Sequence, residues 1–367
     1  MRIKTITCHE VYNHGASLQE YALLKFLNQE GYHAEALHYK PSYLSHHFKL
    51  SAVSFRFDKP LLKQIYLLIK LPGRLIDLKR KRAFDDFAIK YIPTNSKLYN
   101  NNEELIKDLP LAEAFICGSD QIWNSYFENG KDPAFYLDFV PKDKLKISYA
   151  ASFAIDELES SIKPFVKKLV SNLDAVGVRE TSGVRILNEL GIDNAVQVLD
   201  PVFLLSAQHW IDTFVTNEFD KPYLFIYDFD SNPLIEEIAL NLKKEKGFLI
   251  YTVNKNISYA DKNFYLEGPE TFLSLIHHSQ FNITNSFHAV AFSLIFNKKF
   301  VVVNRTEKIN TRMRDLLALV NLDKLIVNEL IDYNDVVNVN STIDHNLLES
   351  HIDRSKSTLL NFLKILK

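Results

Sequence analysis

The residues best suited to acid–base chemistry and to anion binding lie close together in one stretch of the chain. In residues 281–296 an apolar, strand-prone run enters a short polar turn, and the chain then continues in an apolar pattern of helical length. Asn285 or Ser286, in the turn between them, can cap that helix. His288 then lies in the first helical turn, where unpaired backbone N–H groups and the helix dipole favour an anion. The stretch therefore predicts a titratable group beside an anion site.

Cationic side chains follow the next predicted strand. Residues 299–303 form a second apolar run, and Arg305, Lys308 and Arg312 come soon after it. In an open α/β sheet, ligands bind outside the carboxyl ends of the strands. We therefore expect His288 and these cations to lie at the same edge of one sheet.

Size and composition narrow the function classes. The chain has 367 residues and 47% hydrophobic content, which is enough for two domains with separate cores. The net charge of −2 gives no basic field that would favour nucleic acid. Cys8 and Cys117 fit neither a metal-ligand spacing nor a disulfide framework, so we expect reduced core residues in a cytoplasmic protein and no metal site. We also expect no signal peptide and no membrane-spanning helix, because no stretch reaches about 18 apolar residues.

Strands and helices are predicted to alternate along most of the chain. The first unit has a strand within residues 1–7, a helix at 18–29 and a strand at 34–39, and its turn lacks a GxGxxG fingerprint. Later strands are predicted at 114–117, 146–153, 175–179, 195–199, 223–227 and 248–253, with helices at 160–172, 180–190, 232–246 and 269–278. Such alternation predicts an α/β protein with mostly parallel sheets.

Two α/β halves that face each other across a cleft account most simply for this pattern. The change of pattern around residues 201–221 divides an N-terminal domain, residues 1–200, from a C-terminal domain, residues 201–345. An amphipathic helix within 346–367 follows and could pack back on the N-terminal domain.

The segment 44–92 interrupts the alternation. Residues 61–70 are apolar, Pro72 and Gly73 are expected to break the helix, and residues 74–82 are amphipathic and basic. This pattern predicts an inserted helical hairpin. Its basic face is either merely solvated or contacts anionic lipid or a lipid-linked substrate.

Motifs that occur in order along most of the chain resemble those of the polysaccharide pyruvyl transferase family. They are NHGASLQ at 13–19, GSDQIWN at 118–124, SYAASF at 148–153, VRE with SG at 178–183, LDPV at 199–202, TNSFH at 284–288 and NTR at 310–312. The resemblance implies a GT-B-like fold of two Rossmann-like domains. It also implies transfer of the enolpyruvyl unit of phosphoenolpyruvate onto two hydroxyls of a sugar, which forms a pyruvate ketal and releases phosphate.

The resemblance also implies the partners. The acceptor would be a precursor of a bacterial capsule or exopolysaccharide, carried on undecaprenyl diphosphate. Phosphoenolpyruvate is a co-substrate, so no cofactor is expected. The protein would be cytoplasmic, and peripheral contact with the inner face of the membrane stays open. The N-terminal domain, with the segment 44–92, would hold the acceptor, and the C-terminal domain would hold phosphoenolpyruvate.

Donor chemistry assigns roles to the C-terminal residues and to Arg179. Ketal formation needs an acid for the methylene carbon, and His288, with a reference pKa of about 6.5, is the candidate; otherwise it is a core or helix-capping histidine. The family pattern makes Arg179 a clamp for carboxylate or phosphate, the alternative being an interdomain ion pair. Lys308, Arg305 and Arg312 would hold the phosphate, although some of these cations could be merely solvated. Asn285 and Ser286 complete the donor set.

The acceptor set comes from the N-terminal half. Asp120 is either the base for a sugar hydroxyl or the cap of a following helix. Trp123 either stacks on a sugar ring or packs in the core. Ser119, Asn13 and Gln19 would line the same side of the cleft.

Two other functions compete with this one. A GT-B glycosyltransferase would use a nucleotide-sugar donor, and a non-catalytic protein would only bind a sugar or a lipid intermediate.

Overall fold

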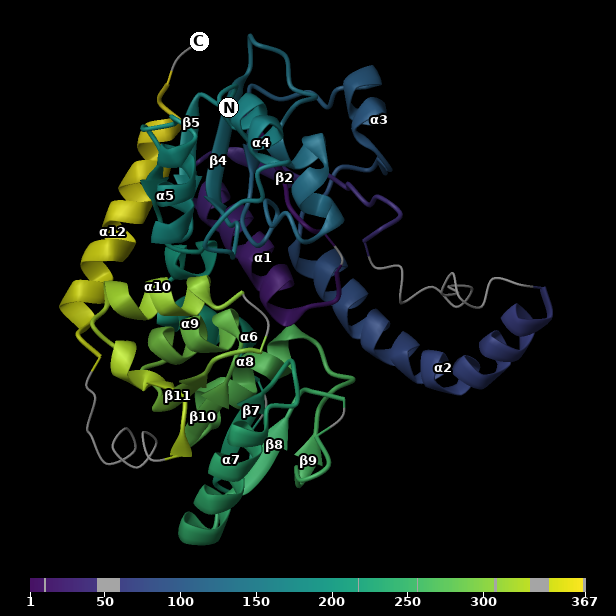
Figure 1. Cartoon of the computed structure of the whole chain (residues 1–367), viewed down its shortest axis with the longest axis vertical. Helices are drawn as coiled ribbons and strands as arrows, with labels where there is room; N and C mark the ends of the chain where they lie inside the picture. Colours follow the sequence, from purple (N-terminus) through teal and green to yellow (C-terminus); the bar gives the residue numbers. More distant parts are fainter. Residues whose placement is uncertain are drawn as a thin grey trace.

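The computed structural model describes residues 1–9, 11–44, 60–216, 218–255, 257–306, 309–330 and 343–365. Two α/β halves lie one above the other (Figure 1). Among the described residues each contains a six-stranded sheet, in the order β2-β1-β3-β4-β5-β6 in the N-terminal half and β12-β11-β10-β7-β8-β9 in the C-terminal half. All pairings between neighbouring strands are parallel. The predicted fold, two α/β domains with parallel sheets, is confirmed.

The N-terminal half begins with the predicted strand–helix–strand unit. Its elements are β1 (Arg2–Ile6), α1 (His14–Gln29), β2 (His33–Ala36), α2 (Pro60–Tyr91), α3 (Asn102–Lys107), β3 (Ala114–Cys117), β4 (Leu145–Ala151), α4 (Lys163–Val170), β5 (Ala175–Val178), α5 (Thr181–Glu189) and β6 (Val196–Gln197). α1 begins four residues earlier than the periodicity predicts, because Asn13 caps it: the Asn13 side chain accepts bonds from the backbone N–H groups of Gly15 and Ala16.

The C-terminal half repeats the alternation. Its elements are β7 (Tyr223–Tyr227), α7 (Pro233–Lys246), β8 (Leu249–Thr252), β9 (Lys262–Asn263), α8 (Pro269–His278), β10 (Phe281–Thr284), α9 (Phe287–Ile295), β11 (Phe300–Val303), α10 (Thr311–Leu319) and β12 (Ile326–Val327). The strands β7, β10 and β11 are buried along their whole length. Near-continuous apolar runs of this kind are typical of parallel strands that helices cover on both faces.

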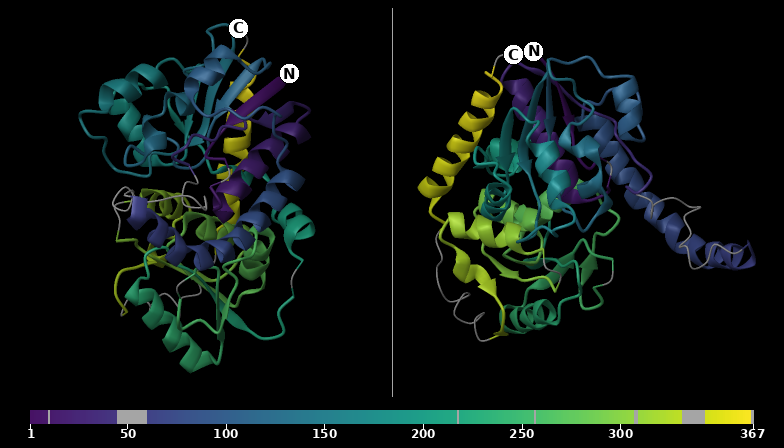
Figure 2. Two further views of the ribbon diagram at one scale, coloured as in Figure 1. Left: turned by 90° about the vertical axis from the view of Figure 1, so that its right-hand side faces the viewer. Right: turned by 45° about the horizontal axis from the view of Figure 1, so that its top comes forward.

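Segments after β6 tie the two halves together. The 3-10 helix η5 (Pro201–Leu204) and the helix α6 (Ala207–Phe214) lead from one sheet to the other. The long C-terminal helix, α12 (His345–Phe362), runs back along the N-terminal half, so the chain ends near its beginning (Figures 1 and 2). There the Ser355 hydroxyl accepts a hydrogen bond of 2.9 Å from the backbone N–H of Leu199.

The predicted hairpin in segment 44–92 is wrong. Residues 60–91 form one continuous helix, α2, with Pro72 inside it, and the helix bends along its length (Figure 1). Proline removes one backbone hydrogen bond and crowds the preceding turn, which kinks a helix without necessarily ending it. Residues 45–59 lie outside the described part of the chain.

Both cysteines are free and buried, as expected of core residues. No helix among the described residues is long and apolar enough to cross a membrane.

Candidate active site

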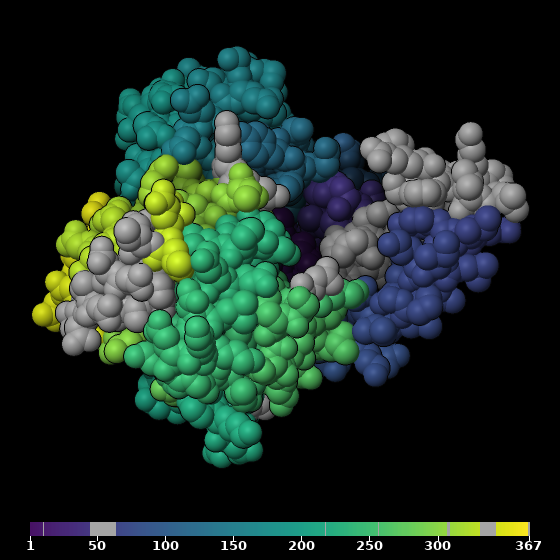
Figure 3. All heavy atoms as spheres, turned by 60° about the horizontal axis from the view of Figure 1, so that its bottom comes forward, coloured from purple at the N-terminus to yellow at the C-terminus, as the bar shows by residue number. Residues whose placement is uncertain are grey.

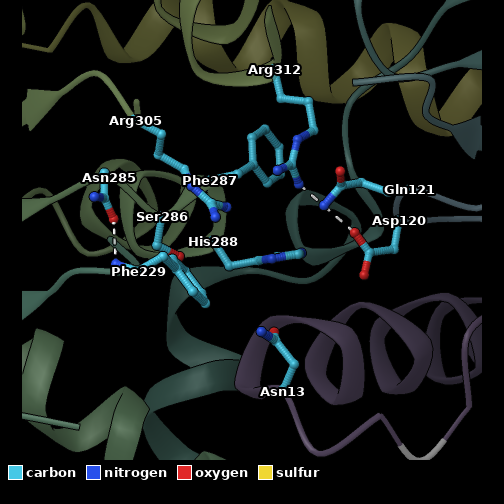
Figure 4. Close-up of a pocket in the computed structure, with 10 residues that line it drawn as sticks. All are labelled: Asn13, Asp120, Gln121, Phe229, Asn285, Ser286, Phe287, His288, Arg305 and Arg312. Atoms are coloured by element: carbon cyan, nitrogen blue, oxygen red, sulfur yellow. Dashed lines mark hydrogen bonds and ion pairs between the residues drawn. The ribbon is translucent and has the colours of Figure 1, made fainter. Parts of the chain in front are cut away.

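A small polar pocket of about 80 Å³ lies where the two halves meet (Figure 4). Its lining residues are Asn13, Asp120, Gln121, Phe229, Asn285, Ser286, Phe287, His288, Arg305 and Arg312. Most of them follow the carboxyl ends of parallel strands, which is the edge that the sequence pattern indicated. Of the eleven predicted site residues that lie in the described part of the chain, seven line this pocket.

His288 belongs to the C-terminal half, but its ring lies against the N-terminal half. It occupies the first turn of α9, where the Ser286 hydroxyl accepts the helix-capping bond from the backbone N–H of Ala289. A methyl group on Gly15, in the first turn of α1, would lie 1.9 Å from His288 Nδ1. Only glycine therefore lets the imidazole pack so closely against α1.

Asp200 lies directly behind His288 and was not among the predicted site residues. His288 Nε2 lies 3.6 Å from Asp200 Oδ2, and the same oxygen accepts bonds from Arg179 Nη1 at 2.6 Å and from the Ser119 hydroxyl at 3.1 Å. Burial alone would raise the pKa of Asp200, but the positive charges of His288 and Arg179 hold it well below its usual range. The signal in the sequence was the Asp-Pro pair that ends the strand at 195–199.

Arg179 is not among the residues that line the pocket, so its expected role as a direct clamp on a substrate stays a prediction. Its guanidinium is buried against three carboxylates: Asp200 at 2.6 Å, Asp120 at 3.5 Å and Glu180 at 3.9 Å. Burial disfavours its charge, but these acids outweigh burial and raise the pKa of Arg179. The alternative, an ion pair, is what the structure contains, although all its members belong to the N-terminal half.

Phe287 joins the two buried arginines. The Arg179 and Arg312 guanidinium carbons lie 4.5 Å and 5.8 Å from the centre of the Phe287 ring, within the range of cation–π contacts. The nearest acid to Arg312 among the described residues is at a distance, with 3.8 Å between Arg312 Nη1 and Asp120 Oδ1, and Glu180 also acts on its charge. Burial, and then repulsion from Arg179, lower the pKa of Arg312 to about 10. Its charge is therefore poorly neutralised within the protein, which suits a site for an anion.

Two further cations were predicted beside Arg312. Arg305 lines the pocket and stacks on Phe229, with 4.9 Å from its guanidinium carbon to the ring centre. Its loop is fixed by paired bonds of 2.9 Å between the Arg305 backbone and the Asn310 side chain. Lys308 lies outside the described residues.

Asn285 and Ser286 form the wall of the pocket, and their bonds go to the protein. The Asn285 amide donates to Asp228 at 2.7 Å and to Asp230 at 2.6 Å, while its oxygen accepts from the backbone N–H of Phe229. These contacts fix the loop after β7 against the turn before α9. The shape of the donor side therefore depends on Asn285.

Asp120 faces His288 from the opposite half (Figure 4). It has a left-handed backbone with a φ of 66°, and residues 121–127 form turns. The helix-cap alternative is therefore wrong, because no helix follows Asp120 in this described stretch. Its carboxylate is open to the pocket and lies near both Arg179 and Arg312.

Three of the residues predicted on the acceptor side do not line the pocket but lie beneath its surface in the N-terminal half. The Gln19 side chain donates to Thr7 and accepts from the backbone N–H of Ser119. The single proton of the Ser119 hydroxyl lies within reach of two acceptors, Ala150 O and Asp200 Oδ2. Gln19 and Ser119 thus hold the loop that carries Asp120. Of the predicted acceptor residues that are not acidic, only Asn13 lines the pocket.

Trp123 is fully buried, which corrects its expected contact with a sugar. Its ring stacks on Tyr136 with 5.3 Å between ring centres, and its Nε1 donates to the Phe135 carbonyl at 2.9 Å. The large apolar surface of an indole is stabilised by core packing, so the core alternative holds.

The two facing α/β halves define a GT-B fold. Solved structures of sugar-active enzymes have the same arrangement. One is UDP-N-acetylglucosamine 2-epimerase from Methanocaldococcus jannaschii. The match covers 99% of this chain and 98% of that enzyme, with 10% identity and a TM-score of 0.50. The Neisseria meningitidis enzyme of the same name, bound to UDP-GlcNAc, matches 98% of this chain over 100% of its own, with 11% identity and a TM-score of 0.49. An E. coli heptosyltransferase with ADP matches 85% of this chain over 90% of its own, with 10% identity and a TM-score of 0.40. At such identities the likeness describes the fold alone.

The family model for polysaccharide pyruvyl transferase matches residues 13–307, most of the chain. The protein therefore belongs to the polysaccharide pyruvyl transferase family and is a pyruvyl transferase of polysaccharide biosynthesis. No curated protein sequence matches the chain.

Proposed function

We propose that the protein transfers the enolpyruvyl unit of phosphoenolpyruvate to two hydroxyls of a sugar, forming a pyruvate ketal and releasing phosphate. One observation carries this proposal: the pocket joins an imidazole, a carboxylate and a buried, poorly neutralised guanidinium from both halves of the chain. Phosphoenolpyruvate is a small anion with a carboxylate and a phosphate, and buried arginine is well suited to bind either group.

The reaction needs an acid, a base and anion-binding groups. A proton adds to the methylene carbon of phosphoenolpyruvate, whose double-bond electrons form the new C–H bond, and the neighbouring carbon becomes electrophilic. One sugar hydroxyl loses its proton to a base and bonds to that carbon. The C–O bond to phosphate then breaks and its electrons leave with the phosphate. The second hydroxyl then bonds to the same carbon and loses its proton. Of the two protons that the hydroxyls release, one restores the acid and the other goes to the departing phosphate.

We assign these roles to residues of the pocket. His288 delivers the proton, and Asp120, across the pocket, takes the proton from the sugar hydroxyl. Arg312 and Arg305 bind the anionic groups of phosphoenolpyruvate, with Lys308 as a further candidate. Asp200 acts through His288: its carboxylate lies 3.6 Å from His288 Nε2 and orients the ring, so Asp200 is a positioning residue.

The acceptor reaches the pocket from the side of Asn13 and Asp120. We propose that it is a precursor of a bacterial surface polysaccharide on an undecaprenyl diphosphate carrier, and that the protein works at the inner face of the membrane. Phosphoenolpyruvate supplies the activated group, so no additional cofactor is required by the chemistry.

The test is incubation of the protein with phosphoenolpyruvate and a panel of lipid-linked saccharides. We expect phosphate release together with a product whose mass matches a pyruvate ketal, and loss of both with His288→Ala. His277→Ala is the matched control, because His277 is a half-buried histidine on α8 outside the pocket. Full ketal formation by His288→Ala would refute the assignment of the active site. Transfer of a sugar from a nucleotide sugar, without ketal formation, would refute phosphoenolpyruvate as the donor.

A further inference from the structure

The outer half of α2 exposes a continuous apolar face. Ile65, Leu68, Ile69, Leu75 and Ile76 are between 47% and 71% exposed. These positions recur at intervals of three, four and seven, so they share one face of the helix. Figure 3 shows α2, in blue, reaching beyond the main body of the molecule. A surface of this kind on a protein body usually marks a place of interaction.

Basic side chains accompany the apolar face. Lys70 and Arg74 lie on the opposite side of the helix, and Lys79 and Arg82 follow in the next turns. Between residues 64 and 82, the single carboxylate is Asp77, and it pairs at 2.6 Å with Lys255 of the C-terminal half. The outer half of α2, residues 65–76, therefore combines an apolar face with two cations and no carboxylate, and further basic residues follow it at 79–82.

The inner half of α2 is fixed to the body beside the pocket. Arg80 is buried and donates to the carbonyl oxygens of Tyr12 and Tyr265, and Phe84 and Phe87 pack in the core. Tyr12 directly precedes Asn13, which lines the pocket. The basic cluster at 79–82 thus includes an anchoring residue, and the surface that remains for a partner lies further out, at residues 65–76.

We propose that the outer half of α2 docks the protein on an anionic phospholipid bilayer, with the apolar face in the headgroup and acyl boundary. A helix with one apolar face and an excess of Lys and Arg is the chemistry that binds such a surface. A second copy of this chain is disfavoured as the occupant, because pairing two copies of this helix would bring two positive segments together. Since the anchor of α2 contacts Tyr12, next to Asn13, docking would hold the pocket near the membrane. The biological purpose rests on the proposed function, but the docking itself does not.

The test is flotation of the full chain with vesicles, without phosphoenolpyruvate or sugar. We expect binding to phosphatidylcholine vesicles that contain phosphatidylglycerol, and about tenfold weaker binding to phosphatidylcholine alone. The L68S/I69S/I76S variant should bind at least about tenfold more weakly, because it removes three apolar side chains that the bilayer would bury. Its matched control is I106S/L111S, which removes two apolar side chains that are 56% and 68% exposed elsewhere.

The charge contribution is tested separately with K70E/R74E, against K244E/K246E on α7 as the control. We expect the first pair alone to weaken binding to anionic vesicles. Equal binding by all four variants, or no vesicle binding by the unmodified chain, would overturn the inference. So would a dimer of the unmodified chain that the L68S/I69S/I76S variant fails to form. Ketal formation on a soluble acceptor reports on the proposed function independently, so the two failures are distinguishable.

Discussion

Gly15→Ala tests whether the pocket works with His288 held against α1. The added methyl group would lie 1.9 Å from His288 Nδ1 and 2.1 Å from its Cγ, whereas ordinary contacts begin at 3.4 Å. The imidazole must therefore move by about 1.5 Å, or the two halves must separate by a similar amount. A displacement of about 1 Å at a reacting group can cost about 10²-fold in rate. We expect ketal formation to fall by about that factor.

The effect on stability should be much smaller than the effect on rate. Gly15 lies in α1 and is not one of the glycines with positive φ, so alanine suits its backbone and gains up to about 1 kcal/mol of helix propensity. Overpacking costs about 1–3 kcal/mol, so the two effects partly cancel. Thermal unfolding should therefore shift by only a few degrees.

The assay is steady-state phosphate release with saturating phosphoenolpyruvate and acceptor, next to thermal unfolding of each variant. Gly183→Ala is the matched control, because its methyl group would meet its nearest neighbour, Val178 Cβ, at an ordinary 3.4 Å. If Gly15→Ala unfolds, the double variant with His288→Ala should regain stability but not activity. Wild-type turnover by Gly15→Ala would refute the placement of the ring.

Three further predictions concern charge and burial. Asp200→Asn should lower kcat strongly and cost about 3–5 kcal/mol of stability, because it leaves the Arg179 guanidinium buried with a weaker partner. The pKa of Asp200 is depressed in the folded state, so its contribution to stability is present above about pH 4 and is lost as the pH falls further. The Asp200→Asn variant should lack this loss when its stability is measured against pH. The same fall in stability at acid pH in variant and wild type would contradict the assignment. Arg312→Gln should raise the KM for phosphoenolpyruvate at least about tenfold while leaving the melting temperature the same or higher, since the pKa of this buried arginine is lowered; an unchanged KM would exclude Arg312 from donor binding. Trp123→Phe should lower the melting temperature but leave the acceptor KM unchanged, and a selective rise in acceptor KM would restore its contact with the sugar.

The sequence by itself determined the order of strands and helices and the end of the sheet at which the chemistry lies. Apolar periodicity and capping residues are local properties, so the strand at 281–284, the cap at Ser286 and the position of His288 in the first turn follow from neighbouring residues. The motifs shared with the family supplied the two-domain fold and most of the pocket residues.

The tertiary structure alone decided which charges meet. Asp200 and Arg179 are 21 positions apart, and Asp120 is 80 positions from Asp200; their contacts depend on how β3, β5 and the turn after β6 end at one edge of the sheet. Likewise, α2 continues through Pro72, and Trp123 is buried. The physical reason is that pairing, burial and the tolerance of a kink depend on partners distant in the chain, whereas capping and periodicity depend only on neighbours.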